Sequence, residues 1–385
     1  MTPIEHIVKC ISLAPQLDKT NLPSDEEWEK IAVVAIAVGL APLLYWQLTQ
    51  IDLDLPPMAR AKLAVLRKAH AKRNQEIADQ LAEILAACAQ KNIAVLVLKG
   101  ALLAPTVYAE PALRPMNDID LLFQADDIDQ AEVVLEELGY SGKHKDADQG
   151  PGVVKHLSTY RRDGNEGATP NPYLSADADR MVEPHISLEE SWFGLKVDIT
   201  PGVWDRAVPI TLNNQPALRL SLVDLLLHLA VHASFHVIMG SSVFLQLYDI
   251  GQVLNVWGDE IKWPELLHRT RQVKAQPFVY AGFYWAKLLY SAPIPETTLA
   301  ALEQDCSPAL VAYVRSLNAS GLLKRTQHPP LVTFQQRLQR GILDRKEAAR
   351  WADSFNAKWQ VWQTALTFHK TDTMNLLKQR LKSEV

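Results

Sequence analysis

Cysteine is scarce in this chain of 385 residues, which holds only Cys10, Cys88 and Cys306. Three widely separated thiols can build neither a disulfide framework nor a four-thiolate zinc site. Such sparse cysteine usage is typical of proteins in a reducing compartment. We therefore expect a cytoplasmic location.

Long apolar runs and an excess of basic charge are also missing. Residues 1–13 lack the basic region, apolar stretch and small-residue cleavage site of an export signal, and no later stretch reaches ~18 uninterrupted apolar residues. Lys and Arg total 39 against 44 for Asp and Glu, which gives a net charge of -5. We expect no membrane span, and the charge gives no signal for duplex nucleic acid as a partner.

Three common catalytic signatures are absent from the contexts in which they act. The chain has no GxSxG nucleophile turn, no GxxxxGK[ST] phosphate loop and no GxGxxG dinucleotide turn, which sets those enzyme classes aside. What remains is an ordinary globular composition, with 48% hydrophobic and 22% charged residues. A chain of this length should fold into two or three units.

Helical patterns occupy the first part of the chain. Residues 26–48 read as one or two helices opened by the caps Ser24 and Asp25, and residues 58–91 as a long amphipathic helix. The apolar run at 93–98 then indicates a buried strand, which Lys99 and Gly100 end abruptly. A helix should begin close to Gly100, because Pro105 is tolerated only near a first turn.

Residues 118–123 read DIDLLF and predict a second strand. Asp118, Asp120 and Leu122 share one face of it, and the alternate apolar residues share the other. Two carboxylates on one face can grip divalent cations, as phosphoryl and nucleotidyl transfer require. Asp-x-Asp alone is a weak signal, but Lys99 and Gly100 upstream, at the junction of a strand and a helix N-terminus, suit a triphosphate.

The remaining pattern completes an α+β fold, in which a small mixed-sheet core is flanked by N-terminal and C-terminal helical regions. A helix ends at Gly139, strands are expected within 153–162, at 181–188 and at 195–200, and residues from 220 onward read mostly as helix. We interpret 163–179 as a mobile hairpin loop. The expected division is a helical region at 1–91, a core at 92–215 and a helical domain at 216–385.

At this point a family resemblance emerges. The segment LVLKGALLAPTVYAEPALRPMNDIDLLF, followed by a helix ending in LGY, resembles the uncharacterised bacterial nucleotidyltransferase family of the polymerase-β-type superfamily. APLLYWQL and KRNQEIADQL upstream, and MVEPHISL, VWDRA, LSLVDLLLHLAVHASFH and LYDIGQVL downstream, follow the order of that family. The resemblance covers about residues 34–254.

The resemblance implies a set of site residues. Asp118 and Asp120 are the paired metal ligands, and Glu183 of VEPH matches the third acidic position. Lys99 and Gly100 stand where the wider superfamily has Gly-Ser. Pro184 replaces a leucine of the family pattern and removes a backbone donor, so we expect this strand to be an edge or to be bulged.

Two assignments stay open in the sequence. Asp198, on a regular strand, is the rival third ligand to Glu183. Arg114 could contact a triphosphate, and it could equally pair with Asp118 or Asp120.

Three histidines recur every four residues on an expected helix, at His228, His232 and His236. Histidines at this spacing can share a metal, but no glutamate completes an HExxH motif. We interpret them as hydrogen-bonded side chains that pack the helical domain against the core, with Asp249 as a partner for one of them.

The sequence thus predicts a Mg²⁺- or Mn²⁺-dependent enzyme that transfers a nucleoside monophosphate from an NTP, with ATP as the expected donor, to an unidentified small molecule or protein. One alternative is a nucleotide-binding or regulatory protein with this fold and little turnover, for example a component of a toxin-antitoxin or biosynthetic operon. Another is a phosphotransferase or hydrolase that uses the same aspartates.

Overall fold

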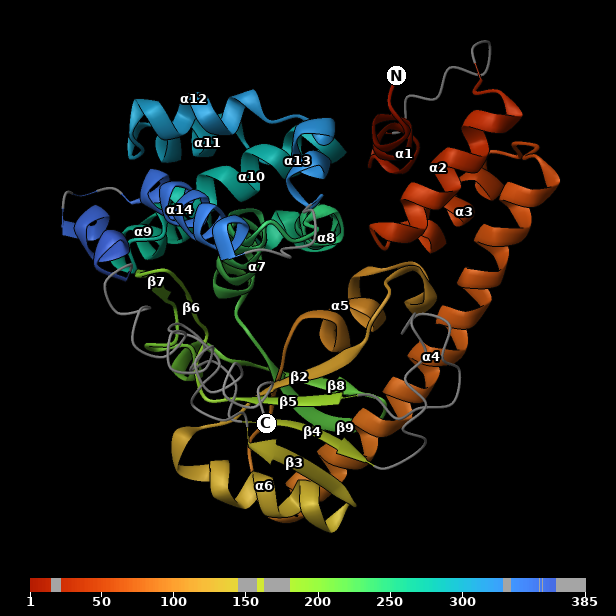
Figure 1. The fold of residues 1–385 in the computed structure, drawn as a ribbon. Coiled ribbons are helices and arrows are strands. Elements are labelled where there is room, and N and C mark those ends of the chain that lie inside the picture. Colours follow the sequence, from red (N-terminus) through yellow and green to blue (C-terminus); the bar gives the residue numbers. More distant parts are fainter. Residues whose placement is uncertain are drawn as a thin grey trace, which may run out of the picture.

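The computed structural model describes residues 1–14, 22–144, 158–162, 181–327, 334–352, 354 and 356–364. Within them the fold is α+β, as predicted. A mixed main sheet and a small second sheet are preceded and followed along the chain by helices (Figure 1). The loop expected at 163–179 lies outside the described residues.

The N-terminal helices follow the sequence pattern closely. They are α1 (Pro3–Ile11), α2 (Asp25–Ala37), α3 (Ala41–Gln50) and the 34-residue α4 (Pro57–Gln90). Ser24 caps α2 by accepting a hydrogen bond from the Glu27 amide. Gly39, with φ +76°, turns the chain between α2 and α3, a conformation that glycine adopts without steric cost.

The main sheet holds seven strands in the order β3-β4-β5-β2-β1-β9-β8. The first half comprises β1 (Leu96–Val97), β2 (Asp118–Leu122), β3 (Tyr140–His144) and β4 (Ser158–Arg162), and the second half β5 (Met181–His185), β8 (Val208–Leu212) and β9 (Gln215–Arg219). The sheet is mixed because β2 runs parallel to β5 and antiparallel to β1, which in turn runs parallel to β9.

Short elements connect these strands. Helix α5 (Lys99–Val107) follows β1 and α6 (Ile128–Glu137) follows β2, while β6 (Glu189–Trp192) and β7 (Leu195–Asp198) form a separate two-stranded sheet. The 3-10 turns are η1 (Pro111–Leu113), η2 (Ala125–Asp127), η3 (Trp204–Arg206) and η4 (Gly258–Glu260).

Strands β3, β6, β8 and β9 were not predicted. The sequence signal for the β8–β9 hairpin was the pair Asn213-Asn214. Both residues have positive φ in the structure, as a two-residue hairpin turn requires. Pro209 and Pro216 within the pair hid its strand character.

Strand β9 begins at Gln215, so the hairpin crosses the boundary expected at 215. The division into 1–91, 92–215 and 216–385 therefore stays a proposal.

The C-terminal region is helical, and in Figure 1 it forms a layer above the sheet. Its helices are α7 (Leu222–Met239), α8 (Phe244–Trp257), α9 (Trp263–Gln272), α10 (Gln276–Tyr290), α11 (Glu296–Gln304), α12 (Pro308–Ser316), α13 (Ala319–Arg325) and α14 (Phe334–Trp351). Of the described helices, only α7 is long and apolar enough to cross a membrane, and its 18-residue window is 83% buried inside the protein. Such burial is that of a core helix.

The first helix belongs structurally with the C-terminal layer. The Thr2 hydroxyl lies 2.7 Å from that of Ser320, and Ser320 also donates to Glu5 at 3.0 Å. The Leu13 amide donates to the Tyr290 carbonyl. The two helical regions that flank the core in sequence therefore touch each other in space (Figure 1).

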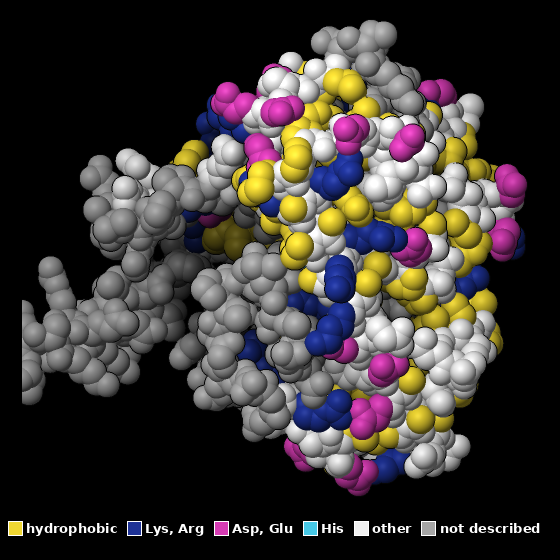
Figure 2. Space-filling view, turned by 90° about the vertical axis from the view of Figure 1, so that its right-hand side faces the viewer, with side chains coloured by type: hydrophobic (Ala, Val, Ile, Leu, Met, Phe, Trp, Pro, Cys, Tyr) yellow, Lys and Arg dark blue, Asp and Glu magenta, His cyan; other side chains and the backbone are white. Residues whose placement is uncertain are grey.

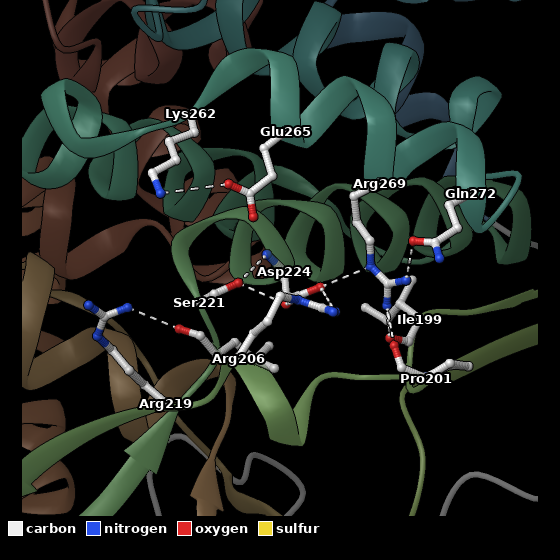
Figure 3. Close-up of polar contacts among 11 residues, drawn as sticks. Ile199, Pro201, Arg206, Arg219, Ser221, Asp224, Lys262, Glu265, Arg269 and Gln272 are labelled. Carbon is white, nitrogen blue, oxygen red and sulfur yellow. Dashed lines mark hydrogen bonds and ion pairs between the residues drawn. The ribbon is translucent and has the colours of Figure 1, made fainter.

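A buried carboxylate joins the core to the helical layer (Figure 3). Asp224 of α7 is fully buried and accepts from Arg206 of η3 at 2.8 and 3.0 Å and from Arg269 of α9 at 3.2 Å. Arg269 also donates to the carbonyls of Ile199 and Pro201, just after β7. Charge-assisted bonds of this kind fix α7 over the end of the small sheet.

Helix α4 lines one side of the molecule, where basic side chains follow one another down the surface with acidic side chains beside several of them (Figure 2). Four ion pairs balance the basic residues along this helix, namely Arg60–Asp54, Lys62–Glu29, Arg67–Glu110 and Lys72–Glu76. The charge of α4 is thus largely neutralised within the chain.

Candidate active site

The paired aspartates lie on β2 as the alternation predicted. Asp120 is 3% exposed, while Ile119 and Leu121 on the opposite face are fully buried. Asp118, at the start of the strand, is half-buried. The apolar face anchors β2 in the core, which leaves both carboxylates on the other face.

Strand β5 brings a third carboxylate beside them. It runs parallel to β2 with Asp120 opposite Glu183 and Leu122 opposite His185. Ligand atoms of Asp120, Glu183 and His185 all lie within 4.8 Å of one another. Asp118 begins the same strand as Asp120 but is outside this tight group.

The rival acidic residue lies in the other sheet. Asp198 ends β7, and its Oδ1 accepts a hydrogen bond from the Thr200 amide at 2.9 Å. The candidate metal cluster found among the described residues contains Glu183 and not Asp198. This placement supports Glu183 as the third carboxylate, an assignment that we carry forward as a proposal.

Asp120 is held by two partners at one oxygen. Lys99 Nζ lies 2.6 Å and His185 Nε2 lies 2.8 Å from Asp120 Oδ1. Although burial opposes ionisation, the charge of Lys99 and the hydrogen bond from His185 hold the pKa of Asp120 well below its ordinary value. The same ion pair outweighs the cost of burying the ammonium and raises the pKa of Lys99. Asp120 is therefore ionised and Lys99 charged.

Asp118 behaves in the opposite way. Burial, followed by the charge of Asp120, raises the pKa of Asp118 to about 7, and Glu183 adds to the effect against the pull of Lys99. Carboxylates that share one face and one small volume disfavour each other's charge. A bound cation would relieve that repulsion, which is the electrostatic signature of a metal-binding carboxylate pair.

The donor set fits a divalent cation. Asp118, Asp120 and Glu183 supply carboxylate oxygens from two adjacent strands, and oxygen ligands are those that Mg²⁺ and Mn²⁺ prefer. A ligand set that converges from more than one strand holds an ion better than two aspartates of one strand.

Arg114 has a different partner from the one expected. Its guanidinium makes a bidentate pair with Asp249 of α8, at 2.9 and 2.7 Å, and Tyr108 donates to the same carboxylate at 2.6 Å. Of the two roles left open for Arg114, pairing with Asp118 or Asp120 is therefore not the one found, and Asp249 pairs with Arg114 and Tyr108 rather than with a histidine. The bidentate geometry is the one that arginine and carboxylate favour.

Gly100 is the residue that lets Arg114 reach this position. A Cβ at Gly100 would collide with Arg114 Nη1 and would lie 2.8 Å from the Met116 side chain. Arg114 consequently packs directly over the first turn of α5, whose leading amide groups lack helical partners. Lys99, Gly100 and Arg114 thus gather at one helix N-terminus, beside Asp118.

These residues line one cavity of about 300 Å³ between the core and the helical layers. The core contributes Lys99, Gly100, Arg114, Asp118 and Asp120 to its wall. Helices α7 and α8 contribute His232, His236, Gln246 and Asp249, and the loop between them contributes Ser242. Residues 37–39, at the end of α2 and in the turn that follows it, complete the wall. A polar cavity at a junction of layers, next to a group with a shifted pKa, has the features of a binding site.

Two of the three histidines of α7, His232 and His236, line this cavity. His232 Nδ1 lies 2.8 Å from Glu190 of β6, and His236 Nδ1 lies 3.0 Å from the Ser242 carbonyl. The ring centroids of His232 and His236 are 4.5 Å apart, and those of His228 and His232 are 6.0 Å apart. In the part of the chain that the structure describes, the candidate metal cluster contains none of the three.

His232 should make stability depend on pH. Burial, followed by the neighbouring His236, holds its pKa well below the ordinary value, against the attraction of Glu190. The unfolded chain takes up a proton near pH 6.5 while the folded chain does not, so stability falls as the pH drops through that value, by up to about 1.4 kcal/mol per pH unit.

His232→Gln tests this assignment. At pH 7.5 the variant should unfold at a lower temperature than the wild type, because the packed imidazole is lost, and most NTP binding should be retained. Between pH 7.5 and pH 5.5 the gap in melting temperature should narrow, since glutamine does not titrate. A gap that stays constant over this range in scanning calorimetry would show that His232 is not a buried neutral imidazole.

The expectation that the strand of Pro184 is an edge strand is wrong. Strand β5 is internal in the sheet order, and Pro184 sits in register with Leu121 of β2. The pairing of β5 with β4 in the described residues is through Val182 and Tyr160, so Pro184 lies beyond it. Within the described residues, Pro184 therefore takes no part in the pairing of β5 with β4.

Two site residues escaped the sequence analysis. His185 was read only as part of a family pattern, and its bond to Asp120 depends on the parallel register of β2 and β5. Glu190, which is buried, was not identified because β6 was not predicted. Residues 188–192 read LEESW, which has no alternation of apolar and polar residues, so no periodic signal for this strand was present in the sequence.

Comparison with known proteins agrees with this geometry. A family model described as an uncharacterised nucleotidyltransferase matches residues 24–291, more than half of the chain. Comparison with curated protein sequences gives no match.

Solved structures give weaker likenesses. The antibiotic-resistance factor ANT(2″)-Ia is 12% identical with a TM-score of 0.35, over 53% of this chain and 94% of that one, and its crystal structure with adenylyl-2″-tobramycin gives 12%, 0.32, 52% and 97%. An antigenic nucleotidyltransferase-like protein from Paracoccidioides brasiliensis is 13% identical with a TM-score of 0.34, over 58% and 96%. Likenesses this weak carry no argument about substrate. The family model matches most of the chain and shows the family: the chain belongs to this nucleotidyltransferase family.

Proposed function

We propose that the protein is a metal-dependent nucleotidyltransferase of the cytoplasm that moves a nucleoside monophosphate from an NTP, ATP being the expected donor, to a hydroxyl or amine of a small molecule or protein. The observation that supports this proposal best is the meeting of Asp118 and Asp120 at one cavity with the N-terminus of α5, with Glu183 opposite Asp120 on the neighbouring strand. Carboxylates for a cation and helix amides for phosphates are the two requirements of the reaction.

Each group has a distinct task in this mechanism. Asp118, Asp120 and Glu183 would hold Mg²⁺ or Mn²⁺, which when bound neutralises charge on the phosphates and activates the attacking oxygen. Lys99 and the first turn of α5 would receive the triphosphate, and Arg114 would flank it. The acceptor would enter from the wall formed by α7 and α8, where Ser242 and Gln246 offer hydrogen bonds.

A second candidate is a protein that binds nucleotide and turns it over slowly, for regulation rather than synthesis. Pro184 favours it, because the strand that carries Glu183 lacks a backbone donor next to the proposed ligand. A phosphotransferase or hydrolase on the same aspartates is the third.

The identity of the released product distinguishes the three. Wild-type protein incubated with Mg²⁺, a panel of NTPs and a panel of hydroxyl and amine acceptors should release pyrophosphate, and Asp120→Asn should not. Release of NDP would indicate the third candidate, with orthophosphate formed beside it by a hydrolase and a phosphorylated acceptor by a phosphotransferase. NTP binding without release of either product from any pair would favour the binding protein.

A further inference from the structure

The carboxylates of the site already hold one cation of the chain itself. Lys99 Nζ is 2.6 Å from Asp120 Oδ1, with the lysine side chain 16% and the aspartate side chain 3% exposed. Asp118 and Glu190 are also close enough to act on Lys99 electrostatically. A buried ammonium among three carboxylates is a structural counter-ion and not a solvated side chain.

The backbone shows that this position is imposed by the fold. Lys99 has φ +44°, a left-handed conformation that costs a non-glycine residue roughly 1–2 kcal/mol. It is the first residue of α5 and directly follows the strand segment that pairs with β2. The strained turn points the lysine toward Asp120, and the ion pair offsets the strain.

The geometry at Asp120 limits how many metal ions it can hold. A carboxylate oxygen has about two lone-pair sites, and Oδ1 accepts from both Lys99 and His185. A carboxylate that bridges two metal ions ~3.5–4 Å apart uses one oxygen for each. With Oδ1 occupied, Asp120 has only Oδ2 to offer, which suffices for one ion.

Lys99 can also perform the task of the missing ion. An ammonium has three donors, of which Asp120 takes one, and Lys99 lines the cavity in which the triphosphate would lie. The other two donors are available to phosphate oxygens. In two-metal sites, the nucleotide-side ion makes this same bridge between carboxylate and phosphate.

We propose that the Lys99 ammonium takes the place of a second metal ion, so that this site binds a single divalent cation even when NTP is bound. The inference rests on the proposed function and specifies its cofactor stoichiometry. Asp118, Glu183 and the free oxygen of Asp120 would hold the one ion.

Counting bound Mn²⁺ tests the proposal without any acceptor. Wild-type protein saturated with α,β-methylene-ATP is titrated with Mn²⁺ and the free ion is followed by electron paramagnetic resonance. We expect one tightly bound Mn²⁺ per chain and no spectral sign of coupling between two ions. Lys99→Arg, which keeps the charge, should also bind one, and Lys99→Met should bind two.

The controls separate the possible failures. Lys68→Met, on the exposed side of α4, should still bind one Mn²⁺, and circular dichroism checks that Lys99→Met is folded. The number of Mn²⁺ ions bound to the wild type, and the spin coupling between them, are measured without any variant. Two coupled ions in the wild type would overturn the Lys99 proposal and leave the proposed function standing. Absence of both analogue and Mn²⁺ binding would overturn the proposed function and the Lys99 proposal with it.

Discussion

Glu183→Gln is expected to lower nucleotidyl transfer at least about 100-fold, equivalent to ~2.7 kcal/mol, while the fold and most NTP affinity are kept. Glu183 stands opposite Asp120 across the parallel pair β2 and β5. Glutamine keeps the shape of the side chain but replaces a charged ligand oxygen of the metal ion with a neutral one. The ion is then held less firmly in the position that the reaction needs. The affinity for Mn²⁺ should fall together with the transfer rate.

Asp198→Asn is the matched control for this substitution. Asp198 lies in the small sheet, where its carboxylate accepts from the Thr200 amide, and an asparagine oxygen can accept the same bond. Transfer and Mn²⁺ affinity should therefore change little. Full activity in Glu183→Gln combined with loss in Asp198→Asn would reverse the assignment of the third carboxylate.

Asp249→Asn is expected to give the largest loss of stability, about 3–5 kcal/mol in the free energy of unfolding. Asp249 is fully buried and accepts from Arg114 twice and from Tyr108 once. An amide leaves the buried guanidinium without a counter-charge. This pair joins Arg114 to α8, so the wall of the NTP cavity should also loosen.

Urea unfolding, followed by circular dichroism, measures this loss. Asp259→Asn, at an exposed position just beyond the same helix, should change the free energy of unfolding by no more than ~0.5 kcal/mol. NTP affinity should fall in Asp249→Asn and not in Asp259→Asn. Equal stability of the two variants would show that the Arg114–Asp249 pair does not join α8 to the core.

Local patterns were sufficient for the elements that carry the carboxylates. The alternation in DIDLLF predicted β2 and the common face of Asp118 and Asp120, and the abrupt end of an apolar run predicted the start of α5 at Lys99 and Gly100. Both signals arise from a few neighbouring residues. They can therefore be recognised from the sequence alone, without knowledge of the rest of the fold.

Contacts between distant segments were not readable in this way. Arg114 and Asp249 are 135 positions apart, and His185 and Asp120 are 65 apart. Each pair depends on how α8 packs or how β5 aligns, which periodicity does not encode. The β8–β9 hairpin was lost for another reason, because its prolines obscured an Asn-Asn turn.

The central claim is that Asp118 and Asp120 bind an NTP through a divalent cation, and calorimetry with α,β-methylene-ATP tests it without an acceptor. In Mg²⁺ the wild type should bind the analogue, and in excess chelator binding should be lost, because the triphosphate would meet uncompensated carboxylates. A double variant, Asp118→Asn with Asp120→Asn, should lose this dependence on metal. Equal affinity of the wild type in Mg²⁺ and in chelator would contradict the account.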